Sequence, residues 1–273
     1  MTSLPNLIVV GAMKCGTTSL HEYLDLHPSI RMSRPKEVDF FSGNNSNQSL
    51  DWYRALFDGS FEIRGESSQN YSKHHHPHFA GAFARMSEII PDVKLIYVVR
   101  DPIARYRSHI LYNYFIESEA AERFNHSSDH FVKTGLYHFQ MMDMLKYFDL
   151  KQILVVDSSD LHQFRHETLN SIFSFLGVEQ LPNDGRFDFV RNKLEDLSVP
   201  RRVRSNLVVR IASKVAPSLT QSALASKLIQ ARLREGGAKR LERHRKSELL
   251  ERYREDTEEL RKLLGQKCEN WSV

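Results

Sequence analysis

Residues 5–24, PNLIVVGAMKCGTTSLHEYL, constrain the fold of this chain more than any other stretch. The apolar run LIVV leads into a turn bounded by Gly11 and Gly16, and a helical pattern follows the turn. Backbone N–H groups in a glycine-bounded turn at the start of a helix form a cradle for an anion. The nucleotide triphosphatase loop carries a lysine directly after its second glycine, whereas Thr17 holds that position here. The stretch therefore predicts a strand, an anion-binding loop and a helix.

Further apolar runs alternate with helical patterns along the chain. KLIYVVRDP (94–102) and KQILVVDSSDL (151–161) are typical of buried strands, and FEIRGESSQNY (61–71) is a weaker strand candidate. The amphipathic stretches HETLNSIFSFLGV and KSELLERYREDTEELRKLLG predict helices. Strands that alternate with helices indicate an α/β fold with a parallel sheet and helices on both faces. We expect ligands at the carboxyl ends of the strands.

The composition is that of a soluble globular protein. The chain has 273 residues, of which 41% are hydrophobic and 26% charged, and we expect a single domain over 1–273. No run approaches the roughly 20 apolar residues of a membrane helix, so no membrane span is expected. The N-terminus lacks the basic region and cleavage site of a signal peptide. Two cysteines do not form a disulfide framework, and we expect a cytoplasmic protein.

The positive charge is concentrated in one segment. Residues 201–246 contain thirteen Lys and Arg against two acidic residues, a local net charge of +11 within a chain whose net charge is +4. Such a segment can meet nucleic acid, an anionic membrane surface or an acidic substrate, or it can form solvated helix faces. No aromatic residue lies between Phe189 and Tyr253, so base stacking is unsupported. We expect residues 182–245 to be a basic helical insertion or lid.

A second anion site is predicted after the strand at 94–102. Arg100 lies at the carboxyl end of that strand, and Pro102 suits the first position of a helix. Ser108 then lies nearly two turns into the helix, roughly 9 to 10 Å along its axis. An arginine fork with a serine hydroxyl can hold a phosphate. Two phosphate sites at one sheet edge suggest a ligand that is phosphorylated at two ends.

These segments carry a family resemblance. GAMKCGTTSL together with VVRDPIARYRS resembles the signature pair of sulfotransferases that use 3′-phosphoadenosine 5′-phosphosulfate (PAPS). LHPSIRMSRPKEVDFF, LDWYRALF and GESSQNY are similar to the branch with the heparan sulfate N- and 3-O-sulfotransferase domains, as a soluble bacterial-type member. The resemblance spans residues 5 to about 178 and about 245 to 265. It implies a P-loop-like three-layer sandwich with a central parallel sheet and a C-terminal helical segment.

The resemblance also implies roles for individual residues. The first loop would hold the 5′-phosphosulfate and the second segment the 3′-phosphate, without a metal. Glu37 of RPKEVDFF is implied as the catalytic base, with Lys36 and Asp39 as weaker candidates. Lys14 would donate to the bridging oxygen of the departing 3′,5′-adenosine bisphosphate. The implied cofactor contacts are Lys14, Cys15, Gly16, Thr17, Thr18, Ser19, Arg100 and Ser108.

The chain departs from the family pattern in two places. Ser67 stands where the 3-O-sulfotransferases carry a lysine. The C-terminal Lys-Gly-Arg loop over the cofactor has no clean counterpart, and Lys239 and Arg240 are the candidates for that role. The acceptor is therefore left open among a carbohydrate, a glycolipid and a small molecule, through a hydroxyl or an amine. The oligomeric state is not predicted.

Two other functions compete with this interpretation. A P-loop phosphotransferase using ATP and magnesium would explain the glycine loop, although the lysine is displaced and no metal-binding aspartate ends the strand at 94–102. A non-enzymatic nucleic-acid-binding protein would explain the basic segment. The run KHHHPHF (73–79), which contains His74 to His78, suggests either a metal site or a loop near the acceptor cleft. Consecutive imidazoles rarely converge on one ion, and we favour the loop.

Overall fold

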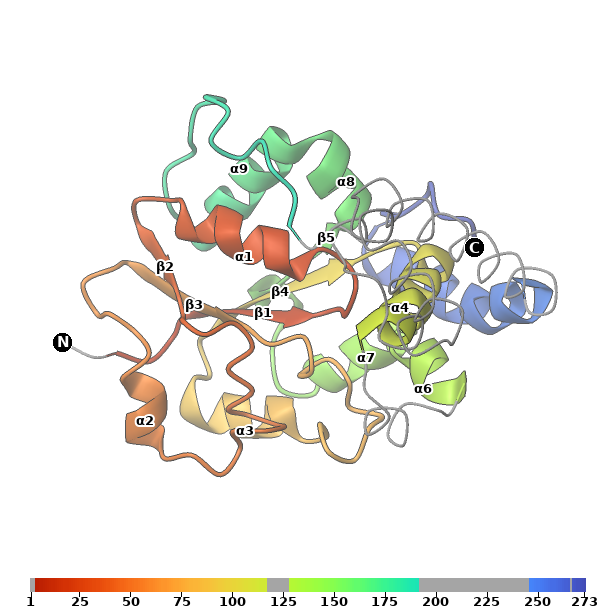
Figure 1. Ribbon diagram of the computed structural model, residues 1–273, viewed down its shortest axis with the longest axis horizontal. Coiled ribbons are helices and arrows are strands. Elements are labelled where there is room, and N and C mark those ends of the chain that lie inside the picture. Colours follow the sequence, from red (N-terminus) through yellow and green to blue (C-terminus); the bar gives the residue numbers. More distant parts are fainter. Residues whose placement is uncertain (1–2, 117–127, 192–245, 266) are drawn as a thin grey trace, which may run out of the picture.

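The computed structural model describes residues 3–116, 128–191, 246–265 and 267–273. At its centre lies a five-stranded parallel sheet with the order β2-β3-β1-β4-β5 (Figure 1). The order reverses beside β1, and ligands of α/β sheets bind at the carboxyl ends of the strands at such a point. The strands are β1 (Leu7–Gly11), β2 (Ile30–Met32), β3 (Ile63–Ser67), β4 (Lys94–Val99) and β5 (Ile153–Asp157).

The strands form where the sequence has continuous apolar runs. Every residue of β1 is buried, and in β4 only Lys94 at the start is partly exposed. Such runs are expected of parallel strands, because helices cover both faces of the sheet. Val9 of β1 is in register with Ser67 of β3 on one side and with Ile96 of β4 on the other. The polar end of β3 is therefore drawn into the centre of the molecule.

Helices cover both faces of the sheet. α1 (Thr17–Asp25) and α9 (Arg165–Leu176) lie on one face, and α3 (Ala82–Ile89) and α7 (Tyr137–Met144) lie on the other (Figure 1). This arrangement confirms the expected three-layer α/β fold. The other helices of the described residues are α2 (Leu50–Arg54), α4 (Pro102–Ile116), α6 (Ser128–Lys133), the short 3₁₀ helix η1 (Leu150–Gln152), α8 (Ser158–Gln163) and a helix over residues 246–263.

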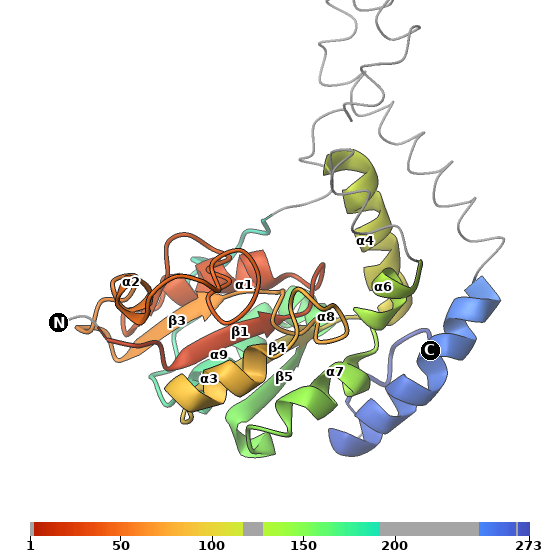
Figure 2. The ribbon, with the colours of Figure 1, turned by 90° about the horizontal axis from the view of Figure 1, so that it is seen from below.

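The helix over residues 246–263 joins the C-terminal segment to the body of the fold (Figure 2). Its Tyr253 is fully buried against α4 and α6, and its hydroxyl donates to the Val132 carbonyl at 3.3 Å. Asp256 accepts the backbone N–H groups of His138 and Phe139 at 3.1 and 2.8 Å, and so caps the first turn of α7. The C-terminal helix therefore stabilises the element that follows α6.

The sequence predicted most of these elements. The strands expected at 61–71, 94–102 and 151–161 are confirmed as β3, β4 and β5, and the two amphipathic helices are also confirmed. β2 was not predicted, because it has only three residues and its central Arg31 is exposed. Most of the predicted basic insertion (182–245) lies outside the described residues, because these omit 192–245, which includes Lys239 and Arg240. No helix of the described residues is long and apolar enough to cross a membrane.

Candidate active site

The loop between β1 and α1 has the backbone of an anion cradle. Gly16 caps α1 with a φ of 96°, a conformation that favours glycine. Its carbonyl accepts Leu20 N–H at 3.1 Å, so the N–H groups of the first turn of α1 have no intrahelical acceptor. At Gly11 a Cβ would lie 2.2 Å from Ser72 Oγ, so a side chain there would displace the turn after β3. The first turn of α1 therefore offers backbone donors to an anion.

Hydroxyl groups surround this helix start. Thr17 and Thr18 occupy the first turn of α1 as predicted, with Thr17 buried and Thr18 partly exposed. Ser19 Oγ accepts the backbone N–H of Arg191 at 3.0 Å, so this hydroxyl already holds a later segment of the chain. Ser158, at the start of α8, brings its Oγ to 3.7 Å from the position of a Cβ on Gly16. Ser158 was not among the predicted site residues, although it directly follows the carboxyl end of β5.

Three cationic side chains lie close together at the loop. The ammonium of Lys14 lies 3.8 Å from the centre of the Tyr112 ring. Burial, followed by the charge of Arg100 and to a lesser degree that of Lys36, lowers the pKa of Lys14 to about 8. Of these cations only Lys36 forms an ion pair within the described part of the chain, and its partner is Glu37. This excess of positive charge fits a polyanionic ligand.

Arg100 lies directly after β4, and Ser108 lies on α4. Arg100 follows β4, and its backbone N–H donates to the Tyr137 hydroxyl at 3.3 Å. Its partly exposed guanidinium has neither an ion pair nor a hydrogen bond to any residue that the structure describes. Ser108 lies partly exposed on α4, and no hydrogen bond joins it to Arg100 or to the loop in the described residues. The unpaired guanidinium is an available phosphate ligand.

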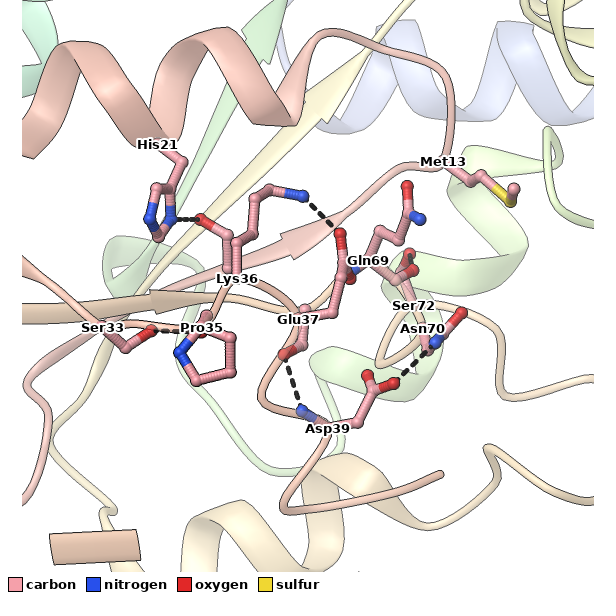
Figure 3. A network of polar contacts seen from close by, with 12 residues as sticks. Met13, His21, Ser33, Pro35, Lys36, Glu37, Asp39, Gln69, Asn70 and Ser72 are labelled. Atoms are coloured by element: carbon pink, nitrogen blue, oxygen red, sulfur yellow. Dashed lines mark hydrogen bonds and ion pairs between the residues drawn. The ribbon is translucent and has the colours of Figure 1, made fainter. Parts of the chain in front are cut away.

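Glu37 lies in the loop after β2, next to the turn that follows β3 (Figure 3). Its Oε2 accepts the backbone N–H of Gln69 at 2.8 Å, and its Oε1 pairs with the ammonium of Lys36. The Glu37 side chain is 26% exposed, so a substrate can reach it. Both oxygens of the carboxylate therefore have a donor, and these two contacts hold the side chain in place at the edge of the site.

Asp39 and Lys73 extend the polar network below Glu37. Asp39 Oδ2 accepts from Asn70 Nδ2 at 2.9 Å, and burial raises the pKa of Asp39 to about 6. Asn70 Oδ1 in turn accepts from Lys73 Nζ at 2.7 Å. The same ammonium lies 3.2 Å from the sulfur of Met13, a residue of the loop after β1. Lys73 therefore places another buried cation beside the loop.

The side chain of Cys15 points away from the proposed ligand site. Its side chain is fully buried, and its sulfur lies 3.5 Å from the Tyr137 hydroxyl. Burial raises the pKa of the thiol to about 11, so it is uncharged at neutral pH. Its backbone N–H donates to Ala12 O at 3.2 Å. The thiol therefore faces the core, and any contact of Cys15 with a cofactor stays a prediction.

The histidine run packs against α6 and α7. Gln140 Nε2 donates to His75 Nδ1 at 2.9 Å, which leaves His75 Nε2–H to donate to His130 Nδ1 at 3.1 Å. Burial lowers the pKa of His75 to about 4 and that of His130 to about 3, so both rings are neutral at pH 7. Among the described residues, no group of three or more His, Cys, Asp or Glu side chains is placed to hold a metal ion.

Several site residues were missed from the sequence. Gln69, Asn70 and Lys73 follow β3, where the carboxyl end of a strand is a signal for ligand contacts. Tyr112 carries no such signal, because it reaches Lys14 only through the packing of α4. The assembled site brings together the glycine loop, three cations and an accessible carboxylate, with Lys36 joining the cations to Glu37.

A family model and two curated relatives match this chain in sequence. Residues 4–198 match the family model described as the sulfotransferase domain. The bifunctional heparan sulfate N-deacetylase/N-sulfotransferase 4 of Mus musculus is 31% identical over 200 residues, which cover 64% of this chain and 22% of that protein. N-deacetylase/N-sulfotransferase 1 of Caenorhabditis elegans is 28% identical over 199 residues, covering 66% of this chain and 23% of its own length. The chain thus spans less than a quarter of the length of these relatives.

Solved structures agree on the fold. A sulfotransferase from Alicyclobacillus acidocaldarius superposes on the chain with a TM-score of 0.54 at 24% identity. The superposition covers 82% of this chain and 96% of the other. At this level of identity the likeness concerns the fold alone.

Proposed function

The chain belongs to the sulfotransferase family, and on that premise we propose that it transfers a sulfuryl group from PAPS to a hydroxyl or amine of an acceptor. The observation that supports this best is the placement of charge at the sheet edge. Lys14 and the unpaired Arg100 lie at the glycine loop, and the accessible carboxylate of Glu37 lies beside the neighbouring strand. An anionic sulfuryl donor and a neutral acceptor need this pair of environments.

The residues at the loop fit the two phosphate ends of PAPS. The first turn of α1, with Thr17 and Thr18, would bind the phosphosulfate through N–H and hydroxyl groups. Arg100, together with Ser108, would hold the 3′-phosphate in the manner of an arginine fork. Bound PAPS supplies the electrophilic sulfur. A contribution from Lys239 and Arg240 is part of the same proposal.

The chain's own side chains supply the proton chemistry. Glu37 takes the proton from the acceptor hydroxyl or amine as the new bond to sulfur forms. Lys14 would donate to the bridging oxygen of the leaving bisphosphate and so stabilise the negative charge that develops there. The hydrogen bond from the backbone N–H of Gln69 and the ion pair with Lys36 orient the Glu37 carboxylate before the acceptor binds.

The acceptor that we propose is a carbohydrate or a small molecule. The relatives quoted above are named for heparan sulfate, and the part of this chain that matches the sulfotransferase domain is residues 4–198. Because Ser67 replaces the lysine of the 3-O-sulfotransferases, an amine acceptor is as well supported as a hydroxyl. A cytoplasmic location, the absence of a metal requirement and the absence of a nucleic-acid partner belong to the same proposal.

The proposal is tested by direct turnover. The purified chain is incubated with PAPS and a panel of amino sugars, N-deacetylated polysaccharide and hydroxyl acceptors, and release of 3′,5′-adenosine bisphosphate is measured. We expect acceptor-dependent release in the presence of a metal chelator. Hydrolysis of ATP with magnesium in place of this release would favour the phosphotransferase alternative.

A further inference from the structure

Glu66, in the buried strand β3, is a carboxyl group that the proposed chemistry does not use. Its side chain is 0% exposed, and neither carboxylate oxygen has a hydrogen-bond partner within the described residues. No cationic side chain of that part of the chain forms an ion pair with it. A buried carboxylate without a partner is strongly unfavourable, so the folded chain holds Glu66 as the neutral acid.

Burial and the acidic neighbours of Glu66 disfavour its ionised form, whereas the nearby hydroxyls of Tyr71 and Tyr53 favour it to a smaller extent. The hydroxyls of Tyr53 and Tyr71 lie beside it, and the charged neighbours are Asp39 and Glu37, both acidic. Burial raises the pKa of Glu66 to about 8, with Asp39 and Glu37 contributing in the same direction. Tyr53 is itself fully buried, with a hydroxyl that has no partner among the described residues. The three polar groups form an uncharged cluster inside an aromatic core.

This cluster is connected to the loop that carries Glu37. The Tyr71 hydroxyl accepts the backbone N–H groups of Phe40 and Phe41 at 2.8 and 3.2 Å. Residues 37–40 form neither helix nor strand, so these two bonds fix the end of the loop. Both bonds use the Tyr71 oxygen as the acceptor, so its own proton is left for another group, and the Glu66 carboxyl lies beside it. A neutral carboxyl group can accept from one tyrosine and donate to the other.

We propose that Glu66 is a positioning residue, which as a neutral acid orients the Tyr71 hydroxyl and thereby holds the loop that presents Glu37. The inference rests on the proposed function, because it concerns the placement of the base. Ionisation of Glu66 places a third negative charge beside Asp39 and Glu37, which repels the loop that carries them, and removes the proton that Glu66 can donate to Tyr53. The loop then shifts, and turnover falls while the distant bisphosphate site is unchanged.

The first test compares pH profiles. The ratio of kcat/KM between the wild-type chain and Glu66→Gln is measured from pH 6.5 to pH 9.5, because glutamine mimics the neutral acid at every pH. The ratio is expected to be constant below pH 7 and to fall, approaching tenfold per pH unit, above about pH 8. Groups shared by both proteins, including Lys14 and Asp39, cancel in the ratio. Glu62→Gln, an exposed neighbour, is the control and should follow the wild-type profile. A ratio that stays constant up to pH 9.5 overturns the proposal.

A second variant keeps the test decisive if Glu66→Gln does not fold. Tyr71→Phe removes the hydroxyl that joins Glu66 to the loop, and it preserves the ring. We expect turnover to fall at least tenfold while the dissociation constant of 3′,5′-adenosine bisphosphate stays within twofold of the wild-type value. An unchanged turnover number in Tyr71→Phe contradicts the proposed connection.

The failure of the proposed function would show differently. A wild-type chain that neither binds the bisphosphate nor transfers a sulfuryl group would end the sulfotransferase proposal. The protonation of Glu66 is then still measurable from unfolding. Because the folded chain keeps a proton that the unfolded chain loses, wild-type stability relative to Glu66→Gln should fall as pH rises from 4.5 to about 8. The absence of that trend overturns the neutral Glu66 independently of activity.

Discussion

The backbone N–H of Gln69 donates a 2.8 Å hydrogen bond to Oε2 of Glu37, and this bond joins the turn after β3 to the loop after β2. With Lys36 on the other oxygen, both oxygens of the carboxylate are engaged before any ligand binds. The side-chain amide of Gln69 lies beside Glu37 (Figure 3) and has no partner in the described part of the chain. The site is therefore preorganised around Glu37, with one polar side chain left for the acceptor.

Glu37→Gln should abolish most of the turnover and leave cofactor binding intact. Loss of a general base typically reduces the rate by about 10² to 10⁴. Glutamine retains the size and the hydrogen bond from Gln69, so the loop should stay in place. The measurement is kcat with saturating PAPS, together with calorimetry of the bisphosphate. Glu88→Gln on the exposed side of α3 is the matched control, and near-wild-type kcat in Glu37→Gln would remove Glu37 from the role.

Arg100→Met should weaken bisphosphate binding by about tenfold or more, because a hydrogen bond to a charged group contributes about 1.5–3 kcal/mol. The guanidinium has no partner in the described residues, so folding should be little affected. Arg54→Met removes a guanidinium that pairs with Asp51 at the surface and serves as the control. An affinity equal to that of the control would show that Arg100 does not contact the ligand.

Bisphosphate affinity should decrease as pH rises through about 8. The pKa of Lys14 is lowered to about 8, so its ammonium is present below that pH and lost above it. Affinity should then decline by up to about tenfold per pH unit, since one proton is lost per site. Lys14→Arg keeps its charge throughout this range, and its affinity should be flat from pH 7 to pH 9.5. Parallel profiles for the two proteins would assign the decline to another group.

His21 should make the folded chain sensitive to acid. Burial lowers the pKa of His21 to about 4, and its Nδ1 lies 2.9 Å from Ser67 Oγ. Between pH 6.5 and about 4 the unfolded chain binds a proton that the folded chain does not, so stability falls as pH falls. Relative to His21→Gln, the wild-type free energy of unfolding should drop by about 1.4 kcal/mol per pH unit in this window. Denaturant titrations measure the difference, and the exposed His162→Gln should show no such trend.

The sequence predicted the parts of the site that local pattern controls. The loop before α1 followed from an apolar run and two glycines, and the position of Arg100 followed from the end of an apolar strand. The contacts of Glu37 could not be predicted, because they join loops 32 residues apart that only the order of the sheet brings together. The burial of Glu66 could not be predicted either, because GESSQNY is mostly polar. Its first residues belong to β3, which is buried because it lies between β2 and β1 in the sheet.

The most direct test of the account is thermal unfolding with two ligands in parallel. One sample contains 3′,5′-adenosine bisphosphate and a metal chelator, and the other contains ATP with magnesium. A ligand at 100 times its dissociation constant stabilises the folded chain by about 2.7 kcal/mol, which raises Tm by several degrees. We expect this rise with the bisphosphate in the absence of metal. A rise with ATP and magnesium alone would contradict it and favour a phosphotransferase.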